Sequence, residues 1–214
     1  MLKELVSIFL NLPCALCQRP TSKILCHYCE QQLKSYQLEN HQQLWQGNLP
    51  VFVWGKYDGT LKRAIASMKY DRLPEIGLLF GEWLGQSWLD VNFNLAQIVV
   101  VPIPLHVNKL KQRGFNQAEK IAEGFCQITG YNLQSKLLTR VKPSQAMFGL
   151  NPNQRKVNIN GAFAVGKIPQ LKMKQKSVLL LDDIWTTGAT VQEAAKVLQQ
   201  KGIKVIGVIV VATP

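Results

Sequence analysis

The architecture of this chain can be read outward from Val178-Leu-Leu-Leu-Asp-Asp-Ile-Trp-Thr-Thr-Gly-Ala-Thr190. The segment opens with an uninterrupted apolar run, which is typical of a strand buried on both faces. Thr190 then precedes apolar residues at helical spacing, and Glu193 follows it in the pattern of a capping box. The segment therefore predicts a buried strand, a polar bend and a helix that begins at Thr190.

The polar bend carries the groups that a phosphorylated sugar needs. Asp182 and Asp183 follow the strand at its carboxyl end, where ligands bind in open α/β sheets. Carboxylates accept hydrogen bonds from sugar hydroxyls, or bind a divalent cation that the hydroxyls also bind. The threonines of residues 186–190, the small Gly188 and Ala189, and the positive end of the next helix suit a phosphate. We therefore predict a site for a phosphorylated ribose.

A plainer interpretation is that the two acids only end a strand and the threonines only cap a helix. Asp-Asp alone, or Thr-Thr-Gly alone, would favour that interpretation. In the order found here every position has a role in a single phosphosugar site, and the whole pattern favours the site.

Strand and helix patterns alternate through most of the chain. Apolar strands without polar interruptions need helices on both faces of the sheet, so the sequence predicts an α/β fold with a mostly parallel sheet. Because residues 178–190 resemble the phosphoribosyl diphosphate motif of type I phosphoribosyltransferases, the sheet is expected to be of the kind found in that family. Expected strands cover residues 51–57, 98–101, 137–141, 162–165, 178–181 and 205–211, and expected helices cover residues 61–68, 76–89, 118–125 and 190–200.

The expected organisation is a small amino-terminal module joined to a larger domain. Residues 1–36 form the module, with a short helix before its cysteines, and residues 51–214 form the alternating domain. Residues 37–50 are rich in Gln and Asn, which predicts a linker. Residues 142–160 have no clear pattern, as is typical of functional lids.

The cysteines of the module have the spacing of a metal site. They form two CxxC pairs separated by eight residues: Cys14, Cys17, Cys26 and Cys29. Disulfides do not persist in a reducing cytosol, whereas four thiolates on two turns can bind a tetrahedral Zn²⁺. We predict a structural zinc with no open coordination position, and redox or disulfide pairs are the alternative.

Composition limits the class of protein. The chain has 214 residues, of which 47% are hydrophobic and 18% charged, enough apolar material for a core. Its apolar runs are much shorter than the ~18 residues that span a bilayer, so no membrane span is expected. The first ten residues lack the cleavage pattern of a signal peptide, and we expect a cytoplasmic protein.

The positive charge is concentrated in one part of the chain. Residues 102–181 hold 13 Lys and Arg against 2 Asp and Glu, which is +11 of the net +12. Such a distribution is the footprint expected for a polyanion, and Phe115, Phe148 and Trp185 can stack on single-stranded bases. Scattered lysines such as Lys172 and Lys174 can instead serve solubility alone. We predict contact with single-stranded DNA.

Two family resemblances follow from these motifs. Residues 178–190 closely resemble the phosphoribosyl diphosphate motif of type I phosphoribosyltransferases. Nearly the whole chain resembles the ComF family, which joins a zinc finger to a phosphoribosyltransferase-type domain and includes proteins needed for DNA uptake in natural transformation. The second resemblance rests on the cysteine pairs, Tyr57-Asp-Gly59, Met68-Lys-Tyr70, Val101-Pro-Ile-Pro-Leu105, Arg113-Gly-Phe-Asn-Gln-Ala118, Gln145, Arg155, Asn158 and Phe163.

The resemblance implies a role for each site residue. Asp182 and Asp183 would hold the ribose hydroxyls, and Mg²⁺ would accompany the pyrophosphate. Trp185 stands where a smaller side chain or a tyrosine is usual. The 5′-phosphate would be held by Thr186, Thr187, Gly188, Ala189 and Thr190, and the pyrophosphate would face a loop of residues 105–115 whose cations are Lys109, Lys111 and Arg113. If the chain is an enzyme, such cations would stabilise the charge that develops on the leaving pyrophosphate, and Arg155 would close over it.

Two functions are compatible with these expectations. The first is a DNA-uptake protein that uses the phosphoribosyl fold to bind single-stranded DNA, or a competence helicase partner, and whose phosphosugar ligand is phosphoribosyl diphosphate. The second is an active phosphoribosyltransferase that transfers the phosphoribosyl group to a nitrogen nucleophile in nucleotide metabolism or salvage. Fold alone does not decide between them.

Overall fold

The computed structural model describes residues 12–44, 49–91, 97–143, 158–166 and 177–214. The helices in these ranges are α2 (His27–Lys34), α3 (Gly59–Tyr70), α4 (Pro74–Asp90), α5 (Val107–Arg113), α6 (Gln117–Thr129) and α8 (Ala189–Gln199). The strands are β1 (Leu12–Pro13), β2 (Pro20–Thr21), β3 (Val51–Lys56), β4 (Ile98–Pro102), β5 (Asn132–Leu133), β6 (Leu138–Arg140), β7 (Phe163–Val165), β8 (Ser177–Ile184) and β9 (Val205–Thr213).

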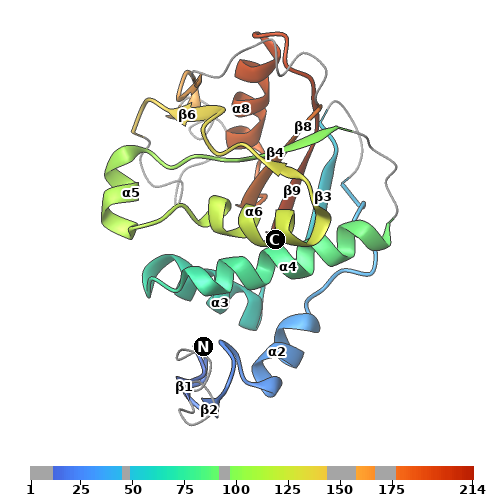
Figure 1. Ribbon diagram of the computed structural model, residues 1–214, viewed down its shortest axis with the longest axis vertical. Helices are drawn as coiled ribbons and strands as arrows, with labels where there is room; N and C mark the ends of the chain where they lie inside the picture. The colour runs from blue at the N-terminus through green and yellow to red at the C-terminus, as the bar shows by residue number, and fades with distance from the viewer. Residues whose placement is uncertain (1–11, 45–48, 92–96, 144–157, 167–176) are drawn as a thin grey trace.

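A parallel sheet of five strands forms the centre of the molecule (Figure 1). Its strand order is β3-β9-β8-β4-β5, and each neighbouring pair is parallel. β8 lies between β9 and β4, so the strand that carries the two acids is central. The predicted α/β fold with a mostly parallel sheet is confirmed.

Helices cover both faces of this sheet because successive side chains of each strand point to opposite sides. Leu179 and Leu181 of β8 belong to the core that contains α3, α4 and α6. Val178 and Leu180 belong to the second core, which contains α8. The uninterrupted apolar run of β8 is therefore explained by burial on both faces.

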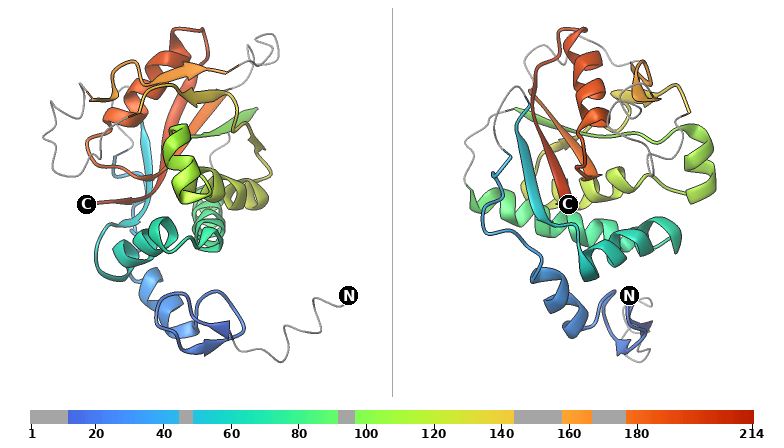
Figure 2. Two further views of the ribbon diagram at one scale, coloured as in Figure 1. Left: turned by 90° about the vertical axis from the view of Figure 1, so that its left-hand side faces the viewer. Right: turned by 180° about the vertical axis from the view of Figure 1, so that it is seen from behind.

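Close packing of α4 against α6 fixes the position of α6 beneath the sheet (Figure 2). A Cβ at Gly124 of α6 would stand 2.1 Å from the carbonyl oxygen of Leu78 in α4, so only glycine allows this approach. Asn116 caps α6, and its Nδ2 donates to the carbonyl oxygen of Ile103 at 3.1 Å. The first turn of α6 is thereby held beside the carboxyl end of β4.

Two expected strands lie outside the central sheet. Residues 137–141 and 162–165 contribute β6 and β7, which form a separate antiparallel pair with Leu138 opposite Val165. Leu137, Leu138 and Phe163 are buried in the core that contains α8. This pair is therefore a cover over the α8 side, which the apolar pattern alone could not distinguish from a sheet strand.

The segment expected to be a linker packs along the outer edge of β3. Leu38 N–H donates to the carbonyl oxygen of Trp54 at 2.9 Å, and Val53 N–H donates to that of His41 at 2.9 Å. The ring of His41 stacks on Phe52 with centroids 5.0 Å apart. These contacts satisfy backbone groups of an edge strand that would otherwise be open to pairing with another chain.

Candidate functional site

The acid pair lies within β8, near the carboxyl end of the strand, and not beyond it. The strand was expected to end at Leu181, but β8 continues to Ile184, and Asp182 and Ile184 pair with Val210 and Ala212 of β9. Both acids are buried, with relative exposures of 9% for Asp182 and 6% for Asp183. The sheet therefore holds the backbone of both acids rigidly.

A small pocket joins the acid pair to the bend that follows it. Asp182 lines it together with residues 184–191, so Asp182 and Thr187 face the same space. Thr186 is exposed, Thr187 and Thr190 are half-buried, and Gly188 and Ala189 are buried. The structure thus brings together the sequence-predicted residues Asp182, Thr186, Thr187, Gly188, Ala189 and Thr190.

The helix after the bend begins one residue earlier than expected, and the predicted capping box is wrong. α8 starts at Ala189 after Gly188, which has a φ of 72° and makes no side-chain capping hydrogen bond. Glu193 instead accepts a hydrogen bond from the N–H of Gly161 at 2.8 Å. The first N–H groups of α8 therefore have no side-chain cap from Gly188, and they lie where an anion is favoured by the helix dipole.

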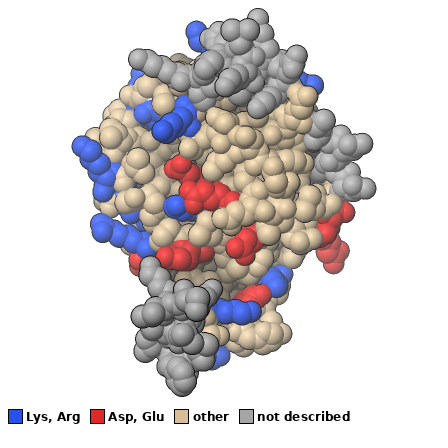
Figure 3. Space-filling view, in the orientation of Figure 1, with Lys and Arg blue, Asp and Glu red and all other residues tan. Residues whose placement is uncertain are grey.

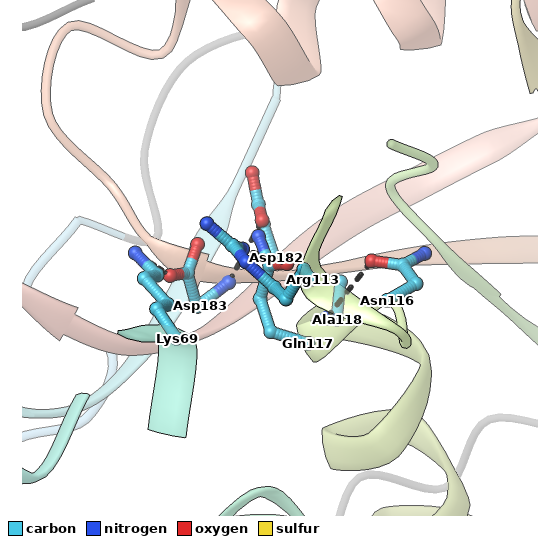
Figure 4. A network of polar contacts seen from close by, with 7 residues as sticks. All are labelled: Lys69, Arg113, Asn116, Gln117, Ala118, Asp182 and Asp183. Atoms are coloured by element: carbon cyan, nitrogen blue, oxygen red, sulfur yellow. Dashed lines mark hydrogen bonds and ion pairs between the residues drawn. The ribbon is translucent and has the colours of Figure 1, made fainter. Parts of the chain in front are cut away.

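Lys69 is the partner of the acid pair that the sequence interpretation did not identify (Figure 4). Its Nζ forms an ion pair with Oδ2 of Asp183, and the Lys69 side chain is only 16% exposed. Lys69 comes from the last turn of α3, far from β8 in the sequence. The signal was present in Met68-Lys-Tyr70, a motif that carried the family resemblance without a role for its lysine.

Burial and this ion pair set the charges of the two acids. Burial, together with the neighbouring Asp183, raises the pKa of Asp182 well above its ordinary value. Burial also opposes ionisation of Asp183, but the charge of Lys69 outweighs it and holds the pKa of Asp183 below its ordinary value. The same pair raises the pKa of Lys69, although burial acts in the opposite direction. The pKa values of the two adjacent carboxyls are therefore shifted in opposite directions, and Asp183 is the stronger acid of the pair.

Positive side chains approach the acid pair from α5 and β6. Lys109 is exposed as a residue, but its partial desolvation lowers its pKa, and the charges of Arg140, Arg113 and Lys69 lower that pKa further. Arg113 donates through Nη1 to Oε1 of Gln117, and its guanidinium lies over the ring of Tyr70 at 5.9 Å. Arg140 lies over the ring of Phe163 at 5.4 Å. Lys109, Arg113 and Arg140 therefore share one charged neighbourhood with Lys69.

The segment expected to be a pyrophosphate loop contains a short helix. Residues 107–113 form α5, which ends at Gly114 in the left-handed conformation with a φ of 89°. His106 caps α5 by accepting from the N–H of Asn108 at 3.3 Å. Lys109 and Lys111 are exposed on α5, and Figure 3 shows Lys and Arg gathered on the side of the molecule where α5 lies.

Some residues that were expected to contact a ligand lie in a different environment, and others lie outside the described residues. Phe115 packs against the apolar core, so it is less open to base stacking than expected. Trp185 lines the pocket of the acid pair. Arg155, Phe148 and Gln145 lie outside the described residues.

The four clustered cysteines form a group that can hold a metal ion. Their Sγ atoms all lie within 4.8 Å of one another, and the group consists of Cys14, Cys17, Cys26 and Cys29. The N–H of Cys26 donates to Sγ of Cys14 at 3.3 Å. Burial opposes the thiolate of Cys14, but backbone hydrogen bonds outweigh it and lower the pKa of Cys14 to about 6. Thiolates are the form that binds metal, so this sulfur is suited to a metal site.

The cysteine cluster lies at one end of the molecule, between the β1–β2 pair and α2 (Figure 1). His27 is exposed beside it and Cys126 stands apart on α6. Burial raises the pKa of Cys126 to about 12, which fits an inert thiol. Across the described ranges, this is the only set of three or more metal-ligating side chains within reach of one ion.

None of the helices in the described part of the chain has the length and apolar character needed to cross a membrane.

Residues 69–214 match the family model described as phosphoribosyl transferase domain. The chain is 28% identical over 109 residues to competence protein F of Haemophilus influenzae, covering 51% of this chain and 47% of that protein. It is 25% identical over 205 residues to DNA utilization protein YhgH of Escherichia coli, covering 91% and 87%. It is 26% identical over 198 residues to competence protein ComFC of Bacillus subtilis, covering 88% and 72%.

A solved structure of adenine phosphoribosyltransferase from Leishmania tarentolae has a TM-score of 0.40 at 12% identity and covers 87% of this chain and 88% of its own. A similarity of this size assigns no substrate.

Proposed function

This chain belongs to the phosphoribosyl transferase domain family, and from that premise we propose that it acts in DNA uptake and binds phosphoribosyl diphosphate. The relatives named competence protein F, ComFC and YhgH identify it as a ComF-family protein. The match spans about half of the Haemophilus influenzae relative, 47%, so the role of the whole protein is part of the proposal.

The observation that carries this proposal is the shared pocket of Asp182 and Thr187. Carboxyl groups at the end of β8 can accept hydrogen bonds from vicinal ribose hydroxyls. The threonine hydroxyls and the uncapped start of α8 can donate to a phosphate. A ligand with both groups on one sugar ring satisfies the two sides of the pocket at once, which a free phosphate or a free sugar does not.

Residue roles follow from this arrangement. Asp182 and Asp183 take the ribose hydroxyls, and residues 186–190 hold the 5′-phosphate. Lys109 and Arg113 are the described cations for the pyrophosphate, and Arg155, outside the described residues, is proposed to close over it. In solution the pyrophosphate carries its own Mg²⁺, which neutralises part of its charge.

We assign Zn²⁺ to the cysteine cluster. Four sulfur ligands within 4.8 Å of one another match the donor set and size of a tetrahedral structural zinc site. All four positions would be filled by protein, so the ion stabilises the amino-terminal module and takes no part in chemistry. The reduced thiols suit a reducing compartment, so we place the protein in the cytoplasm.

Calorimetric titration with phosphoribosyl diphosphate and Mg²⁺ tests the phosphosugar site. The wild type should bind at submillimolar ligand, and Thr187→Val should weaken binding by roughly tenfold because one hydroxyl donor is lost. Thr139→Val is the matched control, since Thr139 is exposed on β6 and bonds to Ala164 instead. Absence of binding by the wild type at millimolar ligand would refute the site.

A second function, binding of single-stranded DNA or of a helicase partner, is favoured by the cations of α5. The transferase alternative is tested in the same titration by assaying pyrophosphate release with a panel of nitrogen nucleophiles. Sustained release would assign an enzyme, whereas binding without release fits a ligand-sensing role in DNA uptake.

A further inference from the structure

Lys69 is placed at the acid pair by the way α3 packs. Met68 is fully buried and Tyr70 is 75% exposed, so Lys69 lies at the boundary between the core and solvent. Its ammonium lies at the carboxyl end of α3, where the helix dipole favours positive charge. The Nζ atom reaches Oδ2 of Asp183, and the two side chains are 16% and 8% exposed. The ion pair is therefore largely shielded from water and is a fixed part of the site.

One oxygen of each acid already has a partner within the protein. Oδ1 of Asp182 accepts from the N–H of Asp183 at 2.9 Å, and Oδ2 of Asp183 is paired with Lys69. Mg²⁺ and Mn²⁺ prefer several free oxygen ligands, and each acid already uses one of its two oxygens. The described residues within reach offer no third acid, because the only group of three or more metal-ligating side chains among them is the cysteine cluster.

The charge around the acid pair also opposes a second cation. Lys69 and Arg113 act on Asp183, and Arg140 and Lys69 act on Asp182. At neutral pH these cations already compensate the negative charge of the pair. A divalent ion on the carboxyls would add two positive charges to a site that has no negative charge left to balance them.

We propose that Lys69 is the resident counter-cation of the acid pair, and that it keeps divalent metal off Asp182 and Asp183 so that ribose hydroxyls bind the carboxyls directly. This inference rests on the proposed phosphosugar site and adds a positioning residue and a metal preference to it. Any Mg²⁺ in the complex then belongs to the pyrophosphate and not to the carboxyls.

Ribose 5-phosphate distinguishes a metal bound to the pyrophosphate from a metal bound to the carboxyls, because this ligand has no pyrophosphate. Its affinity for zinc-loaded wild-type protein should change by less than about twofold between excess Mg²⁺ and a Mg²⁺-free buffer. In Lys69→Met the acid pair loses its counter-cation, and Mg²⁺ should tighten binding by at least about tenfold. Lys62→Met is the matched control, because Lys62 is exposed on the same helix and should leave the wild-type behaviour unchanged.

Mn²⁺ alone gives a readout that needs no sugar. Electron paramagnetic resonance should detect no Mn²⁺ bound at the acid pair of the wild type, one tight Mn²⁺ per chain in Lys69→Met, and its loss in Lys69→Met/Asp183→Asn. A Mn²⁺ site in the wild type that Asp183→Asn removes would overturn the inference.

The outcomes distinguish this inference from the proposed function. If wild type does not bind ribose 5-phosphate with or without Mg²⁺, the phosphosugar site itself fails. If it binds only with Mg²⁺, or if Lys69→Met is as indifferent to Mg²⁺ as the wild type, the site stands and the role of Lys69 is refuted. If Lys69→Met does not fold, the wild-type titrations and Lys69→Arg, which retains the charge and should remain indifferent to Mg²⁺, decide the question.

Discussion

The indole ring of Trp185 lies directly against Gly188. A Cβ built on Gly188 would stand 2.5 Å from two atoms of the ring, and Gly188 has a φ of 72°. Gly188 also precedes the first residue of α8, so it determines how the N–H groups of that helix face the pocket. Glycine is needed here both for its backbone conformation and for the space that Trp185 leaves.

Replacing Gly188 with alanine should therefore impair the pocket as well as the fold. We expect a loss of about 1 kcal/mol of stability from the positive φ alone. The clash with Trp185 should move the start of α8 and weaken binding of ribose 5-phosphate by at least roughly tenfold. Urea unfolding and calorimetric titration measure the two effects separately.

Gly202→Ala is the control for this substitution. Gly202 has nearly the same φ, 73°, but a Cβ there would have nothing within 4 Å. It should lose similar stability and retain full ligand affinity. Equal loss of affinity in both variants would mean that the contact between Trp185 and Gly188 does not shape the pocket.

Replacing each acid with asparagine should change the stability of the protein in opposite directions. Asp183→Asn leaves Lys69 buried without its partner and should cost about 3 kcal/mol of stability at neutral pH. Asp182→Asn retains the oxygen that accepts from Asp183 and removes the cost of a buried acid, so it should stabilise the protein by about 1 kcal/mol. Urea unfolding at neutral pH measures both changes.

The pH dependence of these variants follows from the pKa directions. The pKa of Asp183 is lower in the folded state than in the unfolded state. Asp183 therefore contributes to folding stability at pH values above its unfolded pKa, and this contribution is lost as pH falls through its folded pKa. The pKa of Lys69 is raised in the folded state, so its contribution to folding stability persists to higher pH and is lost only as pH rises through its folded pKa. For Asp182 the pKa is raised, so the gain from Asp182→Asn should shrink toward acid pH. Stabilisation by Asp183→Asn at neutral pH would contradict this assignment.

The sequence predicted most of the elements that bear the site because their signals are local. The apolar run of β8, the threonine-rich bend and the helical stripe of α8 follow one another without a break in residues 177–199. The spacing of the cysteines predicted a cluster that the fold does assemble. Its metal and the roles of the pocket residues stay predictions.

Features that depend on distant segments were not predictable in this way. Lys69 and Asp183 meet only because α3 and β8 are brought together by the sheet order. Glu193 had the spacing of a capping box, but the N–H of Gly161 takes its carboxylate. Similarly, nothing in the Gln-rich residues 37–44 indicated that they would pair with the exposed edge of β3. In each case a tertiary contact replaced the local one.

Loss of one clustered cysteine should remove the metal. Cys29 is buried in the cluster, so Cys29→Ser should reduce bound zinc from one ion per chain to well below one. Limited proteolysis should then cut within residues 12–34, while the central sheet remains protected. Atomic absorption and mass spectrometry of the fragments measure these outcomes.

Cys126→Ser is the control, since Cys126 is a half-buried thiol on α6, apart from the cluster. It should retain the full zinc content. Undiminished zinc in Cys29→Ser, or a metal-free wild type that resists proteolysis at residues 12–34, would show that the cluster is not a structural metal site.

The cations of α5 should determine the salt dependence of single-stranded DNA binding. Lys109 and Lys111 are exposed on one short helix, and each phosphate contact adds about 0.7 to the slope of log affinity against log salt for a single strand. Lys109→Ala/Lys111→Ala should therefore lower the slope by roughly 1.4 and weaken binding at low salt. Lys201→Ala/Lys204→Ala removes the same charge from the turn after α8 and should leave the slope nearly unchanged. Fluorescence anisotropy with a labelled oligonucleotide across a salt series measures both. If the two double variants lose affinity equally, binding depends on net charge, and α5 is not the DNA-binding surface.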